Sequence, residues 1–208
     1  LNVIPITPTI KISADTTTWA PGPNRPSPSD PNPHATWKAN FERQTSAFNS
    51  VYQDWRSWME EGLLDIPLPM NYFRECTHPA DYDKWSDFTK ENQFNRQGMI
   101  GPGTYLNSLD GALDQLARTR LPSQPNGITG AGQAVYVYAA PYASACGGTL
   151  VYDPDGMCTA ISSGTPSRPT PLYPTYVPVP ELPRLTNGKG HLMGTITRSG
   201  SPAPGWID

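Results

Sequence analysis

Charge is scarce in this sequence, and long apolar runs are absent. Asp, Glu, Lys and Arg make up 16% of the 208 residues, against about 25% in an average soluble domain, and the net charge is −3. This balance leaves no basic surface for binding nucleic acid or acidic lipid. No apolar run reaches the about 18 residues that a membrane-spanning helix needs. We therefore expect neither a nucleic-acid partner nor a membrane span.

The sequence marks of several catalytic classes are also missing. His34, His78 and His191 are scattered in expected loops and lack metal-ligand spacing. Cys76 has His78 two residues away, but adjacency in sequence does not establish a nucleophile–base pair. No Gly-x-Ser-x-Gly elbow is present, and no Gly-x-Gly-x-x-Gly loop follows the first expected strand. We expect no metal and no cofactor.

Proline and aromatic residues are abundant instead. Proline accounts for 25 of 208 residues, where about 5% is usual, and the chain has 6 Trp, 10 Tyr and 5 Phe. The aromatics argue against disorder, so the composition indicates a folded body with long, rigid, uncharged loops. The opening LNVIPITPTIKIS lacks a basic segment and a continuous apolar segment, so we interpret it as a strand rather than a signal peptide, as in a fragment. The composition is typical of a secreted or cell-envelope protein.

Strands and helices alternate over the first 140 residues. The expected order is strand 9–14, helix 37–61 with Thr36 as N-cap and Gly62 after its end, strand 63–73, helix 81–92, strand 98–105, a helix capped by Ser108, and strand 130–140. This alternation predicts a parallel sheet with right-handed crossovers, which fits half of an eight-stranded barrel or a small open sheet. Within the helices, the spacing of Trp55, Trp58 and Trp85 marks them as packing residues.

The remainder of the chain has a different character. We expect three parts: a body over 1–145, a loop and Pro-rich linker over 146–188, and the first hairpin of a truncated β module over 189–208. Cys146 and Cys158 bracket a short loop, so we expect a local disulfide between them, with two free thiols as the alternative. Cys76 is left over.

Several motifs invite a comparison with a known family. The segments KISADTTTW, QDWRSWMEEGLLDIPLPMNYFRE, GMIGPGTYLNS, LDQL and VYVYA occur in this order over about residues 10–140. Trp58, Gly62 and Asp65 precede Pro69-Met70-Asn71-Tyr72 within them. This succession resembles the family-ten-like glycosyl hydrolases of bacteria. The resemblance implies the last four strand–helix units of a (β/α) barrel, whose first four strands are absent from this chain.

Glycoside hydrolysis usually needs two carboxyl groups, one as general acid and one as nucleophile or base. Asp15 and Glu75 lie just past two expected strands, at the end of a barrel where active sites are found. Their separation would distinguish retention, at roughly 5 Å, from inversion, at roughly 6.5–9.5 Å. Alternatively Glu75 pairs with Arg74 or Lys84, and Asp15 caps a loop. Asp65 opens its strand at the opposite end and is expected to be structural.

Sugar-binding residues are expected at the same strand ends, where aromatic faces and polar side chains gather. The candidates are Trp19, Asn71, Tyr72, Arg74, Tyr105, Asn107, Tyr138 and Tyr142. Three hypotheses follow: a glycoside hydrolase acting on a polysaccharide, with a bacterial cell-wall glycan as one candidate; a non-catalytic glycan-binding barrel segment; and an unrelated α/β scaffold. Four parallel strands also leave two open edges, through which copies of the chain would be able to associate.

Overall fold

The computed structural model describes residues 11–19 and 21–175. The chain divides into two units, and the second, residues 12–182, holds nearly all of the described part. The expected hairpin at 189–208 and the latter part of the expected linker lie outside the described residues.

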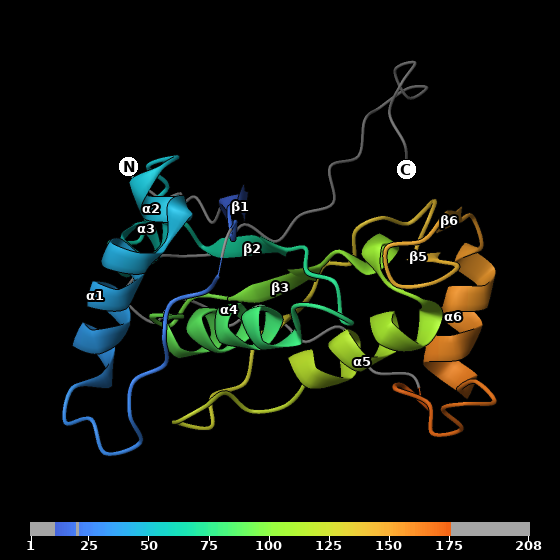
Figure 1. Ribbon diagram of the computed structural model, residues 1–208. Helices are drawn as coiled ribbons and strands as arrows, with labels where there is room; N and C mark the ends of the chain where they lie inside the picture. The colour runs from blue at the N-terminus through green and yellow to red at the C-terminus, as the bar shows by residue number, and fades with distance from the viewer. Residues whose placement is uncertain (1–10, 20, 176–208) are drawn as a thin grey trace, which may run out of the picture. The chain divides into compact units, whose positions relative to one another are not determined.

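Four parallel strands form the central sheet, in the order in which they occur along the chain (Figure 1). They are β1 (Ser13–Thr16), β2 (Ile66–Asn71), β3 (Met99–Pro102) and β4 (Gly132–Gln133). Asp15 lies opposite Leu68, Met70 opposite Gly101, and Met99 opposite Gly132. The prediction of a parallel α/β sheet is confirmed, because each strand pairs with the next one along the chain.

The strands are shorter than the sequence suggested. The expected strand 130–140 pairs only at Gly132–Gln133 and, through one isolated bridge, at Tyr136. The expected strand 98–105 ends at Pro102 and continues as a 3-10 turn, η1 (Thr104–Leu106). The β-prone VYVY segment therefore lies largely beyond the carboxyl end of β4.

Helices connect the strands and cover one face of the sheet. They are α1 (Pro33–Gln44), α2 (Ser46–Asn49) and α3 (Trp55–Glu60) before β2, α4 (Pro79–Glu91) before β3, and α5 (Leu109–Thr119) before β4. Along β2, Pro67, Pro69 and Asn71 are buried, whereas alternate residues are only partly buried. This period of two distinguishes the face packed on helices from the opposite face.

The expected single helix 37–61 is wrong, because three helices occupy that stretch. Thr45 ends α1 in an extended conformation and caps α2, accepting a hydrogen bond from Phe48 N at 3.4 Å. Asp54 then caps α3. The expected N-cap is also wrong, since Asn32 caps α1 instead of Thr36. Two other predictions about helix ends are confirmed. Ser108 caps the start of α5, and Gly62 follows the end of α3 with a positive φ of 83°.

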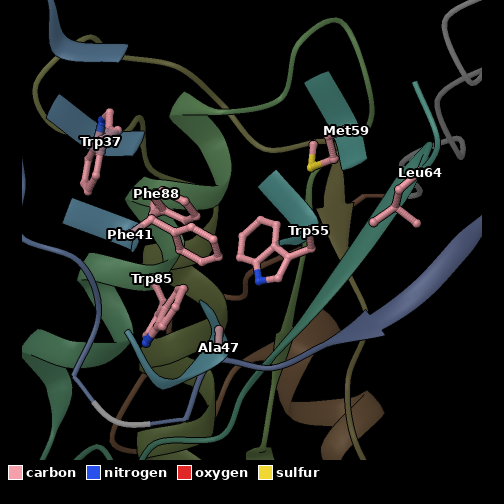
Figure 2. Packing of buried hydrophobic residues seen from close by; sticks show 8 residues of the cluster. All are labelled: Trp37, Phe41, Ala47, Trp55, Met59, Leu64, Trp85 and Phe88. Carbon is pink, nitrogen blue, oxygen red and sulfur yellow. The ribbon is translucent and has the colours of Figure 1, made fainter. Parts of the chain in front are cut away.

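The main core is built from aromatic side chains of α1, α3 and α4 (Figure 2). The rings of Phe41 and Phe88 stack with centroids 4.9 Å apart, and Trp55 meets Phe88 edge-on at 5.1 Å. Trp55 and Trp85 are fully buried, which confirms that they are packing residues; Trp58 packs against the same cluster. Rings in offset or edge-to-face contact add to the stabilisation that burial itself provides.

A second core lies between α5 and a helix that was not expected, α6 (Pro154–Ser163). Asp153 caps α6 and Pro154 occupies its first turn, a helix start that the sequence contained. Leu172 is buried in the same cluster, so the described beginning of the expected linker packs instead of extending freely. A two-stranded antiparallel sheet, β5 (Tyr142–Ala143) with β6 (Leu150–Val151), precedes α6.

The expected disulfide is also wrong. Cys76 pairs with Cys146, with their Cα atoms 6.2 Å apart, and Cys158 is free and exposed. Cys158 lies on α6, whose Met157 and Ala160 face the second core, so its side chain is directed outward. The backbone N of Gly147 donates to Leu106 O at 2.8 Å, which holds the segment of Cys146 against η1.

Candidate functional site

Three tyrosine rings meet where the strands of the sheet end, which we call the carboxyl edge. Tyr72 follows β2, Tyr105 lies in η1 after β3, and Tyr136 follows β4. The rings of Tyr72 and Tyr136 are nearly parallel with centroids 5.4 Å apart, and Tyr105 contacts both edge-on at 6.0 and 5.7 Å. We refer to Tyr72, Tyr105 and Tyr136 as the tyrosine triad.

Backbone contacts hold the tyrosine triad in place. Tyr136 N donates to Pro102 O at 3.2 Å, and Thr104 donates to Tyr136 O through its backbone N and its hydroxyl. A Cβ on Gly103 would lie 2.9 Å from a ring carbon of Tyr72, so glycine permits the close approach of that ring. The triad is therefore built on the ends of the strands and not on a free loop.

The negative charge of Asp15 acts on Tyr72. The pKa of Tyr72 is raised to about 12, chiefly by burial, with smaller contributions from the charge of Asp15 and from Tyr136 and Tyr105. Asp15 itself is exposed and is the next-to-last residue of β1. Tyr72 therefore keeps its proton at neutral pH and can donate a hydrogen bond to a ligand.

A cavity of about 340 Å³ adjoins the tyrosine triad on the side of β1. Its lining residues come from the ends of β1 and β2: Thr17, Thr18, Trp19, Met70, Tyr72 and Phe73. The indole of Trp19 is 74% exposed beside it. The hydroxyl of Thr18 donates to Met70 O at 2.5 Å and ties the two strand ends together. This arrangement offers an apolar floor, an open aromatic face and a phenol hydroxyl.

Glu75 lies in an ion-pair network. Both of its carboxylate oxygens accept hydrogen bonds of 2.6 Å from Arg118, which also bonds to Asp83 at 2.9 Å. These bonds, chiefly the one to Glu75, raise the pKa of Arg118. The partner of Glu75 is thus Arg118 on α5, and neither Arg74 nor Lys84. The two predicted catalytic carboxylates have different neighbours, Tyr72 for Asp15 and Arg118 for Glu75.

The two predicted sugar-binding asparagines are fully buried. Asn71 donates to Tyr82 O at 3.0 Å and to the Ser86 hydroxyl at 3.1 Å, on the helix-covered face of the sheet. Asn107 accepts from Glu75 N at 2.6 Å and donates to Phe73 O at 3.1 Å. Both amides therefore hold backbone segments together and are removed from the surface where a ligand would bind.

The other predicted binding residues have separate positions. Arg74 is exposed, with its guanidinium against the backbone of Gly147. Tyr138 is 74% exposed beyond β4. Tyr142 packs on the second core and donates to Asp153 at 2.9 Å; burial and this bond raise its pKa. Asp65 bonds to Arg96 and to Ile12 N at the opposite end of β2, which agrees with the structural role expected for it.

Tyr136 was not among the predicted site residues. The sequence predicts a strand over 130–140, which places Tyr136 in its interior and only Tyr138 near its end. Because β4 ends at Gln133, Tyr136 instead follows the strand and joins the triad. The sequence does contain a signal for Tyr136. Valine and tyrosine alternate in VYVY, so Tyr136 lies two residues before Tyr138 and is expected on the same face of the chain.

Comparison of the chain with protein-family models, with curated proteins and with solved structures found no match. Within residues 11–19 and 21–175, His, Cys, Asp and Glu side chains form no group of three or more that could hold a metal ion. No helix in the described part of the chain has the length and apolar character needed to cross a membrane.

Proposed function

We propose that the carboxyl edge binds a polysaccharide, and that the chain belongs to a secreted or cell-envelope glycoside hydrolase. The observation that carries the proposal is the combination of the tyrosine triad with Trp19 over the adjoining cavity. Sugar rings present apolar C–H faces and a periphery of hydroxyls. Aromatic faces beside a few fixed polar groups complement both features.

The half-barrel architecture forms part of this proposal. Strands in sequential, parallel order with helices on one face support this part of the proposal, because one half of a (β/α) barrel has the same order. Ile66, Leu68 and Met70 are only partly buried on the other face, which would line the interior of a complete barrel. The Cys76–Cys146 disulfide supports an oxidising compartment, as expected for a secreted or envelope protein.

Affinity measurements test the binding proposal. Isothermal titration with cello-, xylo- and chito-oligosaccharides is expected to find one series that binds wild-type protein. Trp19→Ala and Tyr72→Ala should then weaken binding about tenfold each, which is about 1.4 kcal/mol. Tyr152→Ala is the control, because Tyr152 lies beside β6 and is as exposed as Trp19. Equal affinity in all four proteins would contradict the proposal.

For hydrolysis, we propose Asp15 and Glu75 as the two carboxyl groups. Wild-type protein should release reducing ends from the polysaccharide that it binds, and Asp15→Asn and Glu75→Gln should each lower kcat about 100-fold or more. A wild type that binds but releases nothing favours the non-catalytic alternative. One observation supports that alternative: Arg118 occupies both oxygens of Glu75, so this carboxylate is engaged in a structural ion pair.

A further inference from the structure

Tyr52 has a backbone conformation that is unfavourable for its side chain. It lies between α2 and α3 with a φ of 57°, in the left-handed region that glycine and asparagine adopt most readily. For a bulky residue this conformation is unfavourable, and it persists only when the surroundings enforce it. A glycine at this position would make the same turn with less strain.

The side chain of Tyr52 does not compensate for this strain by packing. It is 82% exposed, and among the described residues it has no hydrogen bond or ring contact. Phe94 provides the contrast, with a φ of 48°: its ring packs against the main core and lies 4.7 Å from the Arg56 guanidinium. Tyr52 therefore combines backbone strain with an aromatic ring left in solvent, a combination that folding alone does not favour.

Tyr52 is adjacent to residues that hold the end of β1. The Gln53 side chain accepts a hydrogen bond from Thr17 N at 2.8 Å, and the Trp55 indole donates to Thr17 O at 3.4 Å. Thr17 lines the cavity beside the tyrosine triad, together with Trp19. The segment that carries Tyr52 is therefore bonded to a residue that lines the cavity of the candidate site.

We propose that Tyr52 is an outer stacking platform of this site, so that the ligand is a chain of several sugar units extending past Trp19. The inference rests on the proposed glycan binding at the carboxyl edge. The cavity of about 340 Å³ holds the inner part of the chain, and Tyr52 contacts units beyond it. The strain at Tyr52 is the consequence of presenting an aromatic face at a turn.

The test compares ligand length. Titration with cello-, xylo- and chito-oligosaccharides of one to six units is expected to show affinity that rises with length in the series that binds. Tyr52→Ala and Tyr52→Gly should weaken hexasaccharide binding about five- to tenfold while leaving disaccharide binding unchanged. Tyr52→Phe keeps the aromatic face and should bind like wild type; Tyr152→Ala serves as the control, because Tyr152 is also an exposed tyrosine and lies beside β6.

Thermal unfolding separates binding from folding. Tyr52→Gly should have a Tm equal to or above that of wild type, because glycine relieves the strain, even as the hexasaccharide affinity falls. Unchanged hexasaccharide affinity in Tyr52→Gly, with weakened binding in Trp19→Ala, overturns this inference and leaves the proposed function standing. A lower Tm with unchanged affinity assigns Tyr52 to the fold and likewise overturns it. Absence of binding by wild type to all three series overturns the proposed function and this inference together.

Discussion

Among single residues, Tyr72 has the environment that most distinguishes the carboxyl edge. Its ring stacks on Tyr136, its backbone follows β2, and the carboxylate of Asp15 lies close enough to act on its hydroxyl. Burial and the neighbouring negative charge both disfavour the phenolate. The proton on Tyr72 is thereby retained in a position where it can serve as a hydrogen-bond donor.

This environment predicts a pH dependence at alkaline pH. The pKa of Tyr72 is raised from its usual value of 10.0 to about 12 in the folded state. The folded protein holds this proton more tightly than the unfolded chain, so the stabilisation is complete below pH 10 and is lost as pH rises from 10 to 12. The difference in phenolate absorbance at 295 nm between wild type and Tyr72→Phe should show one tyrosine that ionises near pH 12.

The same titration of Asp15→Asn provides the control. Removal of the carboxylate should lower the pKa of Tyr72, while burial keeps it above 10. A Tyr72 that ionises near pH 10 in wild-type protein would show that the ring is neither buried nor close to Asp15.

At the scale of elements, the aromatic core joins α1, α3 and α4 into one layer. Phe88 of α4 touches rings from both of the other helices: Phe41 at 4.9 Å and Trp55 at 5.1 Å. The three helices are short and are separated along the chain by irregular segments. Their mutual packing, more than the helix propensity of any one of them, is what holds them in place.

Phe88→Ala should therefore destabilise the protein strongly. Loss of a fully buried ring removes apolar burial and leaves a cavity, which costs about 3–5 kcal/mol in the free energy of unfolding. Urea denaturation followed by tryptophan fluorescence measures this loss. Trp58→Ala, at a partly buried position on the same cluster, should show a smaller loss. A Phe88→Ala loss no larger than that of Trp58→Ala would contradict the packing described.

At the scale of the whole described part, the Cys76–Cys146 disulfide connects distant segments. It joins the segment after β2 to the one that precedes β6, across 70 residues that contain α4, β3, α5 and β4. A cross-link that closes so long a loop restricts the unfolded chain strongly. Cys76 directly follows Glu75, whose backbone N donates to Asn107, so the disulfide also restrains this contact.

Removal of this disulfide should lower stability markedly. The double variant Cys76→Ser/Cys146→Ser should lose about 4 kcal/mol in the free energy of unfolding, from loop entropy alone. Urea denaturation without reductant measures the loss, and reductant should bring wild type to the same midpoint. Cys158→Ser, which removes the exposed free thiol, should unfold like wild type. If Cys158→Ser were instead the destabilised variant, the cysteine pairing would be different from the one described.

Local pattern was sufficient for part of the fold. Strand β2, helices α4 and α5, and the Ser108 cap follow from apolar runs and from polar residues at helix ends, interactions that reach no farther than a few residues. The helix expected at 37–61 failed because its apolar spacing continues through the segment of Val51 and Tyr52, which the structure leaves exposed. Periodicity records where apolar residues recur but not whether another element covers them.

The candidate site divides in the same way. That Tyr72 and Tyr105 lie at strand ends was predictable, because parallel strands bring their carboxyl ends to one edge. That Asn71 and Asn107 are buried was not, because their partners Tyr82 and Gln115 lie 11 and 8 residues away on helices. The ion pair of Glu75 was not predictable either, because its partner Arg118 is 43 residues away along the chain.

By itself the sequence determined the alternation of strands and helices, the parallel sheet and the edge at which aromatic residues gather. These features follow from short-range periodicity and from the direction of the chain. Only the tertiary structure decided that Cys146 pairs with Cys76, that Tyr136 completes the triad and that Tyr52 stands in solvent. Each of these outcomes depends on contacts between segments that are far apart in the sequence. Short-range sequence patterns do not distinguish between the possible contacts, and packing of the whole chain selects among them.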